Sequence, residues 1–155
     1  MREAELITAF YAAFARRDAA AMRACYHPEV VFSDPVFGEL SGEHAGEMWA
    51  MLCSRAKDLA ISCSGVSADA GEGSARWEAT YTFTHTGRRV HNVIDARFRF
   101  RDGLIVRHDD HFDLYRWSRM AFGPAGVLLG WTPFFQAKIR ANAKRGFGSW
   151  LAKRR

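Results

Sequence analysis

The first part of the chain spaces its apolar residues as amphipathic helices do. This pattern covers residues 3–16, 19–25 and 43–57, and each segment carries one apolar stripe. Such a stripe lets one face of a helix pack on a protein core. A short run of strand-forming residues at 29–33 interrupts the series. We therefore predict three helices, with one short strand between the second and the third.

From residue 59 onward, apolar and polar residues alternate, which is the pattern of strands with one buried face. The alternation predicts strands at 59–69, 74–84, 89–101 and 104–115. The segments between them are short and contain glycine, as hairpin turns do. Helices first and hairpin-linked strands after them predict an α+β fold. We expect a cone-shaped domain over residues 1–116, with the N-terminal helices packed on a curved antiparallel sheet.

The C-terminal segment differs in charge from the rest of the chain. Residues 116–155 contain nine Lys and Arg and no Asp or Glu, which leaves 13 basic and 17 acidic residues in 1–115. The net charge of +5 therefore belongs to this segment, and we expect no nucleic-acid partner. Residues 117–155 are predicted to form a basic, aromatic helical extension, with a helix at 133–145. Its glycine- and proline-rich corners favour packing on the cone over contact with a membrane surface.

The composition is that of a cytoplasmic globular protein. Apolar residues make up 48% of the chain, yet no apolar stretch approaches the roughly 20 residues of a membrane span. Cys25, Cys53 and Cys63 lack metal-ligand spacing and fit free thiols in a reducing compartment. His108 and His111 fall on opposite faces of a predicted strand, so we expect no metal site and no cofactor. Apolar residues on more than one face of the sheet favour a homodimer.

Asp34 is the most informative polar residue of the chain. It stands at the end of the predicted short strand, directly before Pro35 and among apolar neighbours such as Phe32 and Val36. Burial in such surroundings raises the pKa of a carboxyl group toward the range that suits a general base. An aspartate before proline also commonly caps a turn, and that structural interpretation stays open.

Asp34 is expected to face a pocket with an apolar wall, which suits a small hydrophobic molecule. The predicted wall consists of aromatic and aliphatic side chains from the helices, the strand of Asp34 and the later strands. These residues are Phe10, Phe14, Tyr26, Phe32, Phe37, Trp49, Leu52, Phe98 and Phe112.

Several segments resemble a known superfamily. They are Asp18 between the first two helices, Tyr26, the motif at 31–36, the strand at 94–100 and the acidic closing motif at 109–113. Over about residues 4–116 the chain resembles the ketosteroid isomerases and the wider nuclear-transport-factor-2-like, SnoaL-like superfamily. The resemblance implies the cone fold and proton transfer, in an isomerisation or a cyclisation, with Asp34 as general base.

In those isomerases a tyrosine and a protonated aspartic acid hold the oxyanion. The corresponding positions here hold Phe10 and Ala96, with Tyr11 and Asp95 one residue away. Neighbouring residues of a helix or strand point in different directions, so the base lacks its usual partners.

Two alternatives remain open. The chain also resembles the limonene epoxide hydrolases of the same fold, which implies that Asp110, Arg76 and Glu78 activate water against an epoxide. However, Arg76 and Glu78 alternate with apolar residues such as Trp77, a pattern equally typical of a solvated sheet face. The third hypothesis is a non-catalytic module that binds a ligand or forms a dimer, because this fold does not by itself imply catalysis.

Overall fold

The computed structural model describes residues 2–55 and 57–154. Position 56, inside the helix predicted over 43–57, and the two chain ends, 1 and 155, lie outside the described residues. The helices are α1 (Glu3–Ala15), α2 (Ala19–Ala24), α3 (Glu43–Arg55), α4 (Leu114–Phe122), α5 (Pro124–Leu129) and α6 (Pro133–Lys153). The strands are β1 (Tyr26–Asp34), β2 (Gly38–Ser41), β3 (Ala60–Asp69), β4 (Glu72–Phe83), β5 (Arg88–Arg101) and β6 (Leu104–His111).

The strands form one mixed sheet in the order β2-β1-β6-β5-β4-β3. The meander from β3 to β6 is antiparallel, as predicted, and β1 pairs with β2 in the same way. The pairing of β1 with β6 is parallel. Hydrophobic alternation within a strand carries no information about a neighbour so distant in sequence. The α+β class is confirmed, and the sheet is mixed where a wholly antiparallel one was predicted.

Tight turns hold the meander in register. Asp102 and Gly103 both adopt positive φ, of 56° and 74°, at the hairpin between β5 and β6. Two successive residues with positive φ form the two-residue turn whose twist matches that of paired strands. An Asp-Gly pair is the sequence signal for such a turn, and it places the hairpin correctly here.

Several elements and boundaries differ from the sequence prediction. The strand predicted to run to residue 115 ends at His111, because the Asp113 carboxylate accepts the Arg116 backbone N–H at 3.0 Å and caps α4. The loop predicted after Asp34 contains β2, and the C-terminal helix continues past Gly146 to Lys153. Helix α4 was missed although Leu114, Trp117 and Ala121 bury one face at helical spacing.

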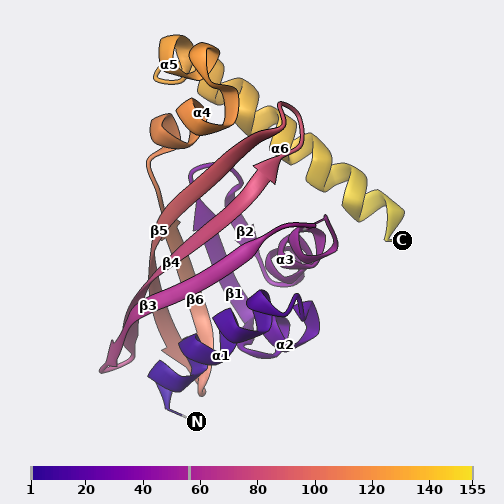
Figure 1. The fold of residues 1–155 in the computed structure, drawn as a ribbon. Coiled ribbons are helices and arrows are strands. Elements are labelled where there is room, and N and C mark those ends of the chain that lie inside the picture. The colour runs from indigo at the N-terminus through magenta and orange to yellow at the C-terminus, as the bar shows by residue number, and fades with distance from the viewer. Residues whose placement is uncertain (1, 56, 155) are drawn as a thin grey trace.

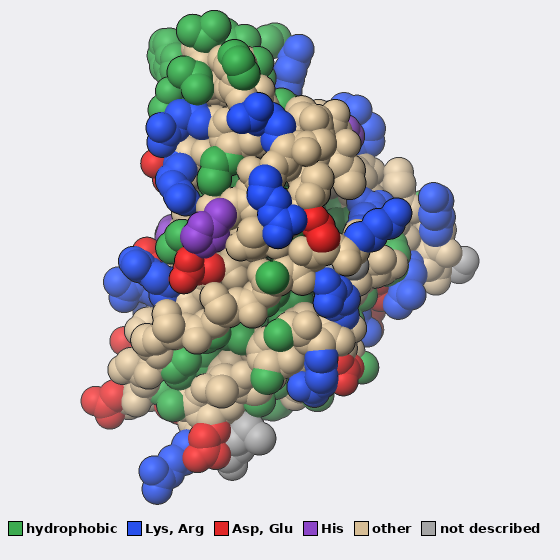
Figure 2. Space-filling model, in the orientation of Figure 1, with side chains coloured by type: hydrophobic (Ala, Val, Ile, Leu, Met, Phe, Trp, Pro, Cys, Tyr) green, Lys and Arg blue, Asp and Glu red, His purple; other side chains and the backbone are tan. Residues whose placement is uncertain are grey.

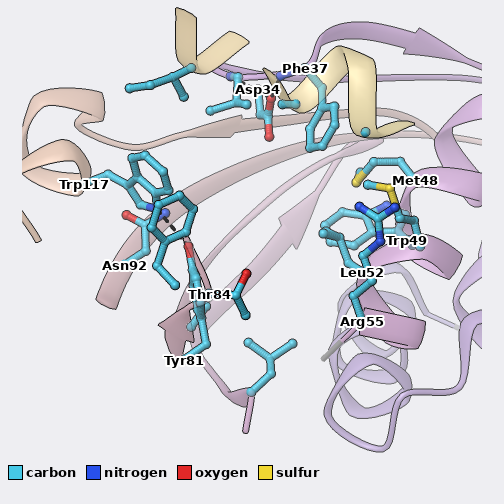
Figure 3. A pocket seen from close by; sticks show the side chains of 18 of the residues that line it. Asp34, Phe37, Met48, Trp49, Leu52, Arg55, Tyr81, Thr84, Asn92 and Trp117 are labelled. Atoms are coloured by element: carbon cyan, nitrogen blue, oxygen red, sulfur yellow. Dashed lines mark hydrogen bonds between the residues drawn. The ribbon is translucent and has the colours of Figure 1, made fainter. Parts of the chain in front are cut away.

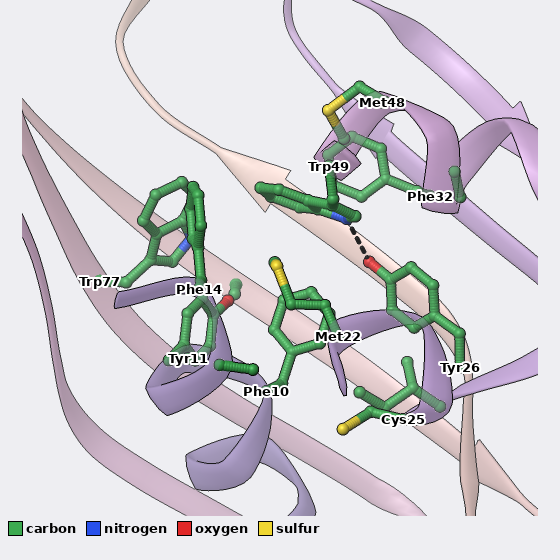
Figure 4. Packing of buried hydrophobic residues seen from close by; sticks show 14 of the residues in the cluster. Phe10, Tyr11, Phe14, Met22, Cys25, Tyr26, Phe32, Met48, Trp49 and Trp77 are labelled. Carbon is green, nitrogen blue, oxygen red and sulfur yellow. Dashed lines mark hydrogen bonds between the residues drawn. The ribbon is translucent and has the colours of Figure 1, made fainter. Parts of the chain in front are cut away.

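Helices α1, α2 and α3 pack on one face of the sheet (Figure 1). Helices α4 and α5 lie at the end of the sheet that is farther from α1 and α2. The main core lies between these first helices and the sheet. Phe10, Phe32 and Trp49 are almost fully buried there, and their rings meet edge to face (Figure 4). A second, smaller cluster around Val90 and Trp117 joins β5 to α4. The space between the two clusters contains the candidate site.

Candidate functional site

A large cavity separates the two hydrophobic clusters. Its volume is about 1020 Å³, and α3, α4, α6 and the sheet all contribute to its walls. Aromatic and aliphatic side chains predominate in the lining. The apolar residues include Phe14, Phe32, Phe37, Met48, Trp49, Leu52, Trp77, Ile94, Phe112, Trp117, Phe122 and Ile139. A cavity of this size and lining suits a small hydrophobic ligand.

Asp34 points into this cavity from the end of β1 (Figure 3). Its Oδ1 atom accepts the backbone N–H groups of Val36 and Phe37, at 2.9 and 2.6 Å. The turn after Pro35 therefore fixes one oxygen of the carboxyl group. Within the described structure Oδ2 has no hydrogen bond, which leaves it available to a ligand. Asp34 therefore caps the turn through Oδ1 and also borders the cavity.

Burial raises the pKa of Asp34 from 3.8 to about 6. The two backbone N–H groups oppose this shift, because they stabilise the charged form. The negative charge of Asp110 adds to the rise, so the two carboxyl groups interact electrostatically across the site. A carboxyl group with a pKa near 6 remains a moderately strong base, and at neutral pH it is mostly ionised.

A chain of buried polar groups leads from the core to Asp110. The Trp49 Nε1–H donates to the Tyr26 hydroxyl at 2.8 Å (Figure 4), and that hydroxyl lies 2.8 Å from His108 Nδ1. His108 Nε2 lies 2.9 Å from Asp110 Oδ1, which also accepts Trp77 Nε1–H at 3.3 Å. His108 and Asp110 are 0% and 3% exposed. Polar groups buried this deeply need hydrogen-bond partners, so each group in the series is expected to bond to the next.

The hydrogen bonds in this series of buried groups all run in the same direction, from Trp49 toward Asp110. The Tyr26 oxygen already accepts the Trp49 N–H, so its own proton has a partner only if it donates to His108 Nδ1. Burial raises the pKa of the Tyr26 hydroxyl well above its ordinary value, so the proton stays on oxygen. His108 is then neutral, with its proton on Nε2, and donates to the Asp110 carboxylate. We call these four residues, Trp49, Tyr26, His108 and Asp110, the buried relay.

Asp110 ends the buried relay at the cavity wall. Its Oδ1 atom receives both the His108 and the Trp77 donors, and Oδ2 has no protein partner in the described structure. No buried side-chain oxygen or nitrogen of the described residues lacks a hydrogen bond, so Oδ2 is accessible from the cavity. Asp34 and Asp110 thus each present one anchored and one free oxygen to the same space.

The structure brings together most of the residues that the sequence predicted for the site. Asp34 and Asp110 line the cavity with six of the predicted wall residues. These six are Phe14, Phe32, Phe37, Trp49, Leu52 and Phe112. Phe10, Tyr26 and Phe98 do not belong to the wall. Phe10 stacks on Tyr26 with ring centroids 5.2 Å apart, and Phe98 packs 4.5 Å from His108, so all three lie in the core beneath the site.

Arg76 and Glu78 lie away from the cavity, contrary to the epoxide-hydrolase hypothesis. Arg76 pairs with Asp95 at 3.1 Å, and Glu78 contacts His91 Nε2 at 2.6 Å. Both pairs are on the outer face of the sheet, because the side chains of β4 alternate and Trp77 takes the inner face. The solvated-face interpretation is therefore correct, and the set of Asp110, Arg76 and Glu78 is not assembled.

The oxyanion-donor positions are apolar, but other donors line the cavity. Tyr81 accepts Trp117 Nε1–H at 2.8 Å, which leaves its own O–H free to donate (Figure 3). Asn92 is 7% exposed, and its carboxamide has no hydrogen bond within the described structure. Sequence reasoning missed both residues. The sequence could have revealed Asn92 as an inward-facing residue. It lies two and four residues before Ile94 and Ala96, so strand alternation puts it on the same buried face.

Helix α6 closes one side of the cavity with Ile139, Ala143 and Gly146. Its Arg140 Nε donates to the Pro35 carbonyl at 2.8 Å, so the helix also supports the turn that holds Asp34. We expected the C-terminal extension to pack on the cone, but no local pattern placed its helix at this cavity.

Positive charge borders the cavity as well. The residues concerned are Arg55, Lys57 and Arg145. None of the three has an ion pair with another described residue. Over the same part of the chain, no group of three or more His, Cys, Asp or Glu side chains is placed to hold a metal ion.

The amino-acid sequence matches a known protein family. A family model described as a SnoaL-like domain matches residues 7–108. No curated protein matches the chain in sequence.

Many solved structures are similar in fold, and three of them follow. One is a hypothetical protein with a ketosteroid isomerase-like fold from Catenulispora acidiphila, with 16% identity and a TM-score of 0.69 over 83% of this chain and 98% of that one. A putative polyketide cyclase from Xanthomonas campestris has 21% identity and a TM-score of 0.63, over 76% and 94%. An epoxide hydrolase of M. tuberculosis, described as LEH-like, has 17% identity and a TM-score of 0.62, over 80% and 90%. At these identities the likeness shows the fold.

Proposed function

The chain belongs to the SnoaL-like domain family, and we propose that it is an enzyme that moves a proton on a small hydrophobic substrate, with Asp34 as the general base. The reaction class is an isomerisation or a cyclisation of a carbonyl compound. The resemblance to the ketosteroid isomerases and the similarity to a putative polyketide cyclase both support this class.

One observation carries the proposal: the cavity-facing carboxyl group of Asp34 has a pKa of about 6. A base of this strength is ionised at neutral pH and holds an abstracted proton more firmly than an ordinary aspartate does. Its anchored Oδ1 keeps the group in place, while Oδ2 faces the ligand. A carboxyl group with a purely structural role gains nothing from this cavity-facing oxygen.

Removal of a proton beside a carbonyl leaves negative charge on the carbonyl oxygen, which requires a hydrogen-bond donor. Tyr81 and Asn92 supply the candidate donors, because both line the cavity and have donor groups without a protein acceptor. They replace the tyrosine and aspartic acid of the isomerases, whose positions hold Phe10 and Ala96. The arrangement of the donors therefore differs from that of a steroid isomerase, so a different substrate is expected.

The lining also restricts the class of substrate. Aromatic walls favour a flat, apolar body, and the cations at Arg55 and Arg145 favour an acidic substituent near α3 and α6. The proposed substrate is therefore an aromatic or polycyclic carbonyl compound, neutral or singly acidic.

The test has two stages. A thermal-shift screen with steroid enones and polyketide-like aromatic ketones identifies compounds that bind. Deuterium uptake at the carbon beside the carbonyl of a bound compound then measures proton transfer. Asp34→Asn should reduce uptake at least a hundredfold, as expected for loss of a general base. The wild-type rate should rise as the pH passes about 6, where Asp34 ionises.

Asp109→Asn is the matched control, since Asp109 lies on the opposite face of β6 and bonds to Ser33 and Arg107. It should keep the wild-type rate. Unchanged uptake in folded Asp34→Asn would disprove the role of Asp34.

A second candidate function is ligand binding without turnover, because both oxyanion-donor positions of the isomerases are apolar and buried. It predicts compounds that raise the melting temperature of the wild-type protein but take up no deuterium above the uncatalysed rate.

A further inference from the structure

Beyond the residues that match the family, α5 and the segment after it display large apolar side chains to solvent. Leu128, Trp131 and Phe134 are 70%, 64% and 71% exposed, and Val127 and Leu129 are about half exposed. We call these five residues the apolar cap. Figure 2 shows hydrophobic side chains gathered at this end of the molecule. Large apolar residues exposed together, rather than singly, indicate an interaction surface.

The cap is held rigidly. The Cβ of any other residue at Gly126 would overlap the Ser118 carbonyl, so α5 packs backbone to backbone against α4. The Tyr115 hydroxyl donates to the Val127 carbonyl at 2.9 Å, and Trp131 Nε1–H donates to the Leu128 carbonyl at 3.0 Å. These contacts fix the backbone of α5 while its apolar side chains face outward. Their exposure is therefore a feature of the folded state.

Cations surround the cap. Lys138 Nζ lies 4.6 Å from the centre of the Phe134 ring. The Arg119 guanidinium lies 4.9 Å from the ring of Tyr115, the residue that tethers Val127. Arg88 packs against Gly123, where α5 begins. No Asp or Glu follows Asp113 in the sequence. Basic side chains lie beside the cap in Figure 2.

We propose that the apolar cap inserts into the surface of an anionic lipid membrane, with Arg88, Arg119 and Lys138 binding the lipid head groups. Apolar and aromatic side chains flanked by Lys and Arg are the features of proteins that lie in the membrane interface. Tryptophan in particular prefers this depth. Among the described residues, no helix is sufficiently long and apolar to cross a membrane, so the contact is with one leaflet.

Charge favours lipid over a second copy of the chain. A symmetric dimer through the cap would bring the two sets of Arg88, Arg119 and Lys138 close together, because the same patch is used by both copies. No acidic residue of α4, α5 or α6 is available to neutralise them. An anionic lipid surface instead supplies the opposite charge over the whole rim of the cap.

Vesicle co-sedimentation of the full chain tests the proposal. The wild-type protein should bind phosphatidylcholine vesicles that contain phosphatidylglycerol, and should not bind vesicles of phosphatidylcholine alone. Leu128→Ser combined with Trp131→Ser should weaken binding at least tenfold. Arg119→Gln combined with Lys138→Gln should weaken it about thirtyfold, from the loss of two cations at the membrane. All four side chains are exposed, so the variants should fold, as thermal melting would verify.

Arg97→Gln combined with Arg99→Gln is the matched control. It removes the same charge from exposed positions of β5 and should bind as the wild type does. Equal weakening by this control would mean that net charge alone drives binding and would overturn the proposal. Absence of wild-type binding to the anionic vesicles would overturn it too. The same holds if the wild type is dimeric without lipid and Leu128→Ser makes it monomeric, since the cap would then be a dimer contact.

Discussion

Substitution of Tyr26 by phenylalanine gives the sharpest test of the buried relay. The change removes one oxygen atom and leaves the ring, so no sizeable cavity forms. It leaves the Trp49 Nε1–H without its acceptor and His108 Nδ1 without its donor, each formerly bonded at 2.8 Å. Both residues are almost fully buried, so water cannot easily replace the lost hydroxyl.

The expected loss of stability follows from these two groups. Each buried polar group left without a partner costs about 1–3 kcal/mol, so the two groups together should lower the free energy of unfolding of Tyr26→Phe by about 2–6 kcal/mol. For a chain of this length, each kcal/mol corresponds to roughly 2–4 °C in melting temperature. Urea denaturation followed by circular dichroism at neutral pH measures the change directly.

Tyr81→Phe is the internal control. Tyr81 also accepts a tryptophan N–H at 2.8 Å, from Trp117, but it borders the open cavity and no second protein group depends on it. Its loss should therefore cost only about 1 kcal/mol. If Tyr26→Phe proves no more destabilising than Tyr81→Phe, the hydrogen-bonded relay through His108 is refuted.

Two further predictions concern stability. The folded protein holds the Asp34 proton up to about pH 6, whereas the unfolded chain releases it near 3.8, so stability falls as the pH rises between these values. At about pH 8, Asp34→Asn should therefore be more stable than the wild type by up to roughly 3 kcal/mol. At about pH 4 the two proteins should be nearly equal in stability. Urea denaturation measures both differences, and equal stability at both pH values would contradict the prediction. Gly126→Ala should cost about 1–3 kcal/mol by overlap with Ser118, whereas Gly148→Ala, with open space beside it in α6, should add about 0.5–1 kcal/mol in the same assay. An equal effect of both alanines would show that α5 does not pack as tightly as described.

The sequence by itself determined the features that depend on local pattern. Helical spacing and strand alternation gave the α+β class, and the Asp-Gly pair placed the last hairpin. Asp34 was recognisable because its signals lie within a few residues: a strand end, a following proline and apolar neighbours. Asp110 is two residues after His108, so strand alternation put both side chains on the same face, and both are buried in the structure. Where two local patterns competed, as at the start of α4, the strand prediction ran too far.

The tertiary structure decided everything that depends on pairing between distant segments. The parallel contact of β1 with β6 brings Tyr26 and His108 together, although 82 residues separate them in sequence. The alternation in β4 put Arg76 and Glu78 on the face opposite Trp77, but only the structure showed that the Trp77 face is the one that lines the cavity. Helix α6 reaches Pro35 across 105 residues and closes the cavity. Such contacts depend on the summed packing of the whole chain, and no local pattern records them.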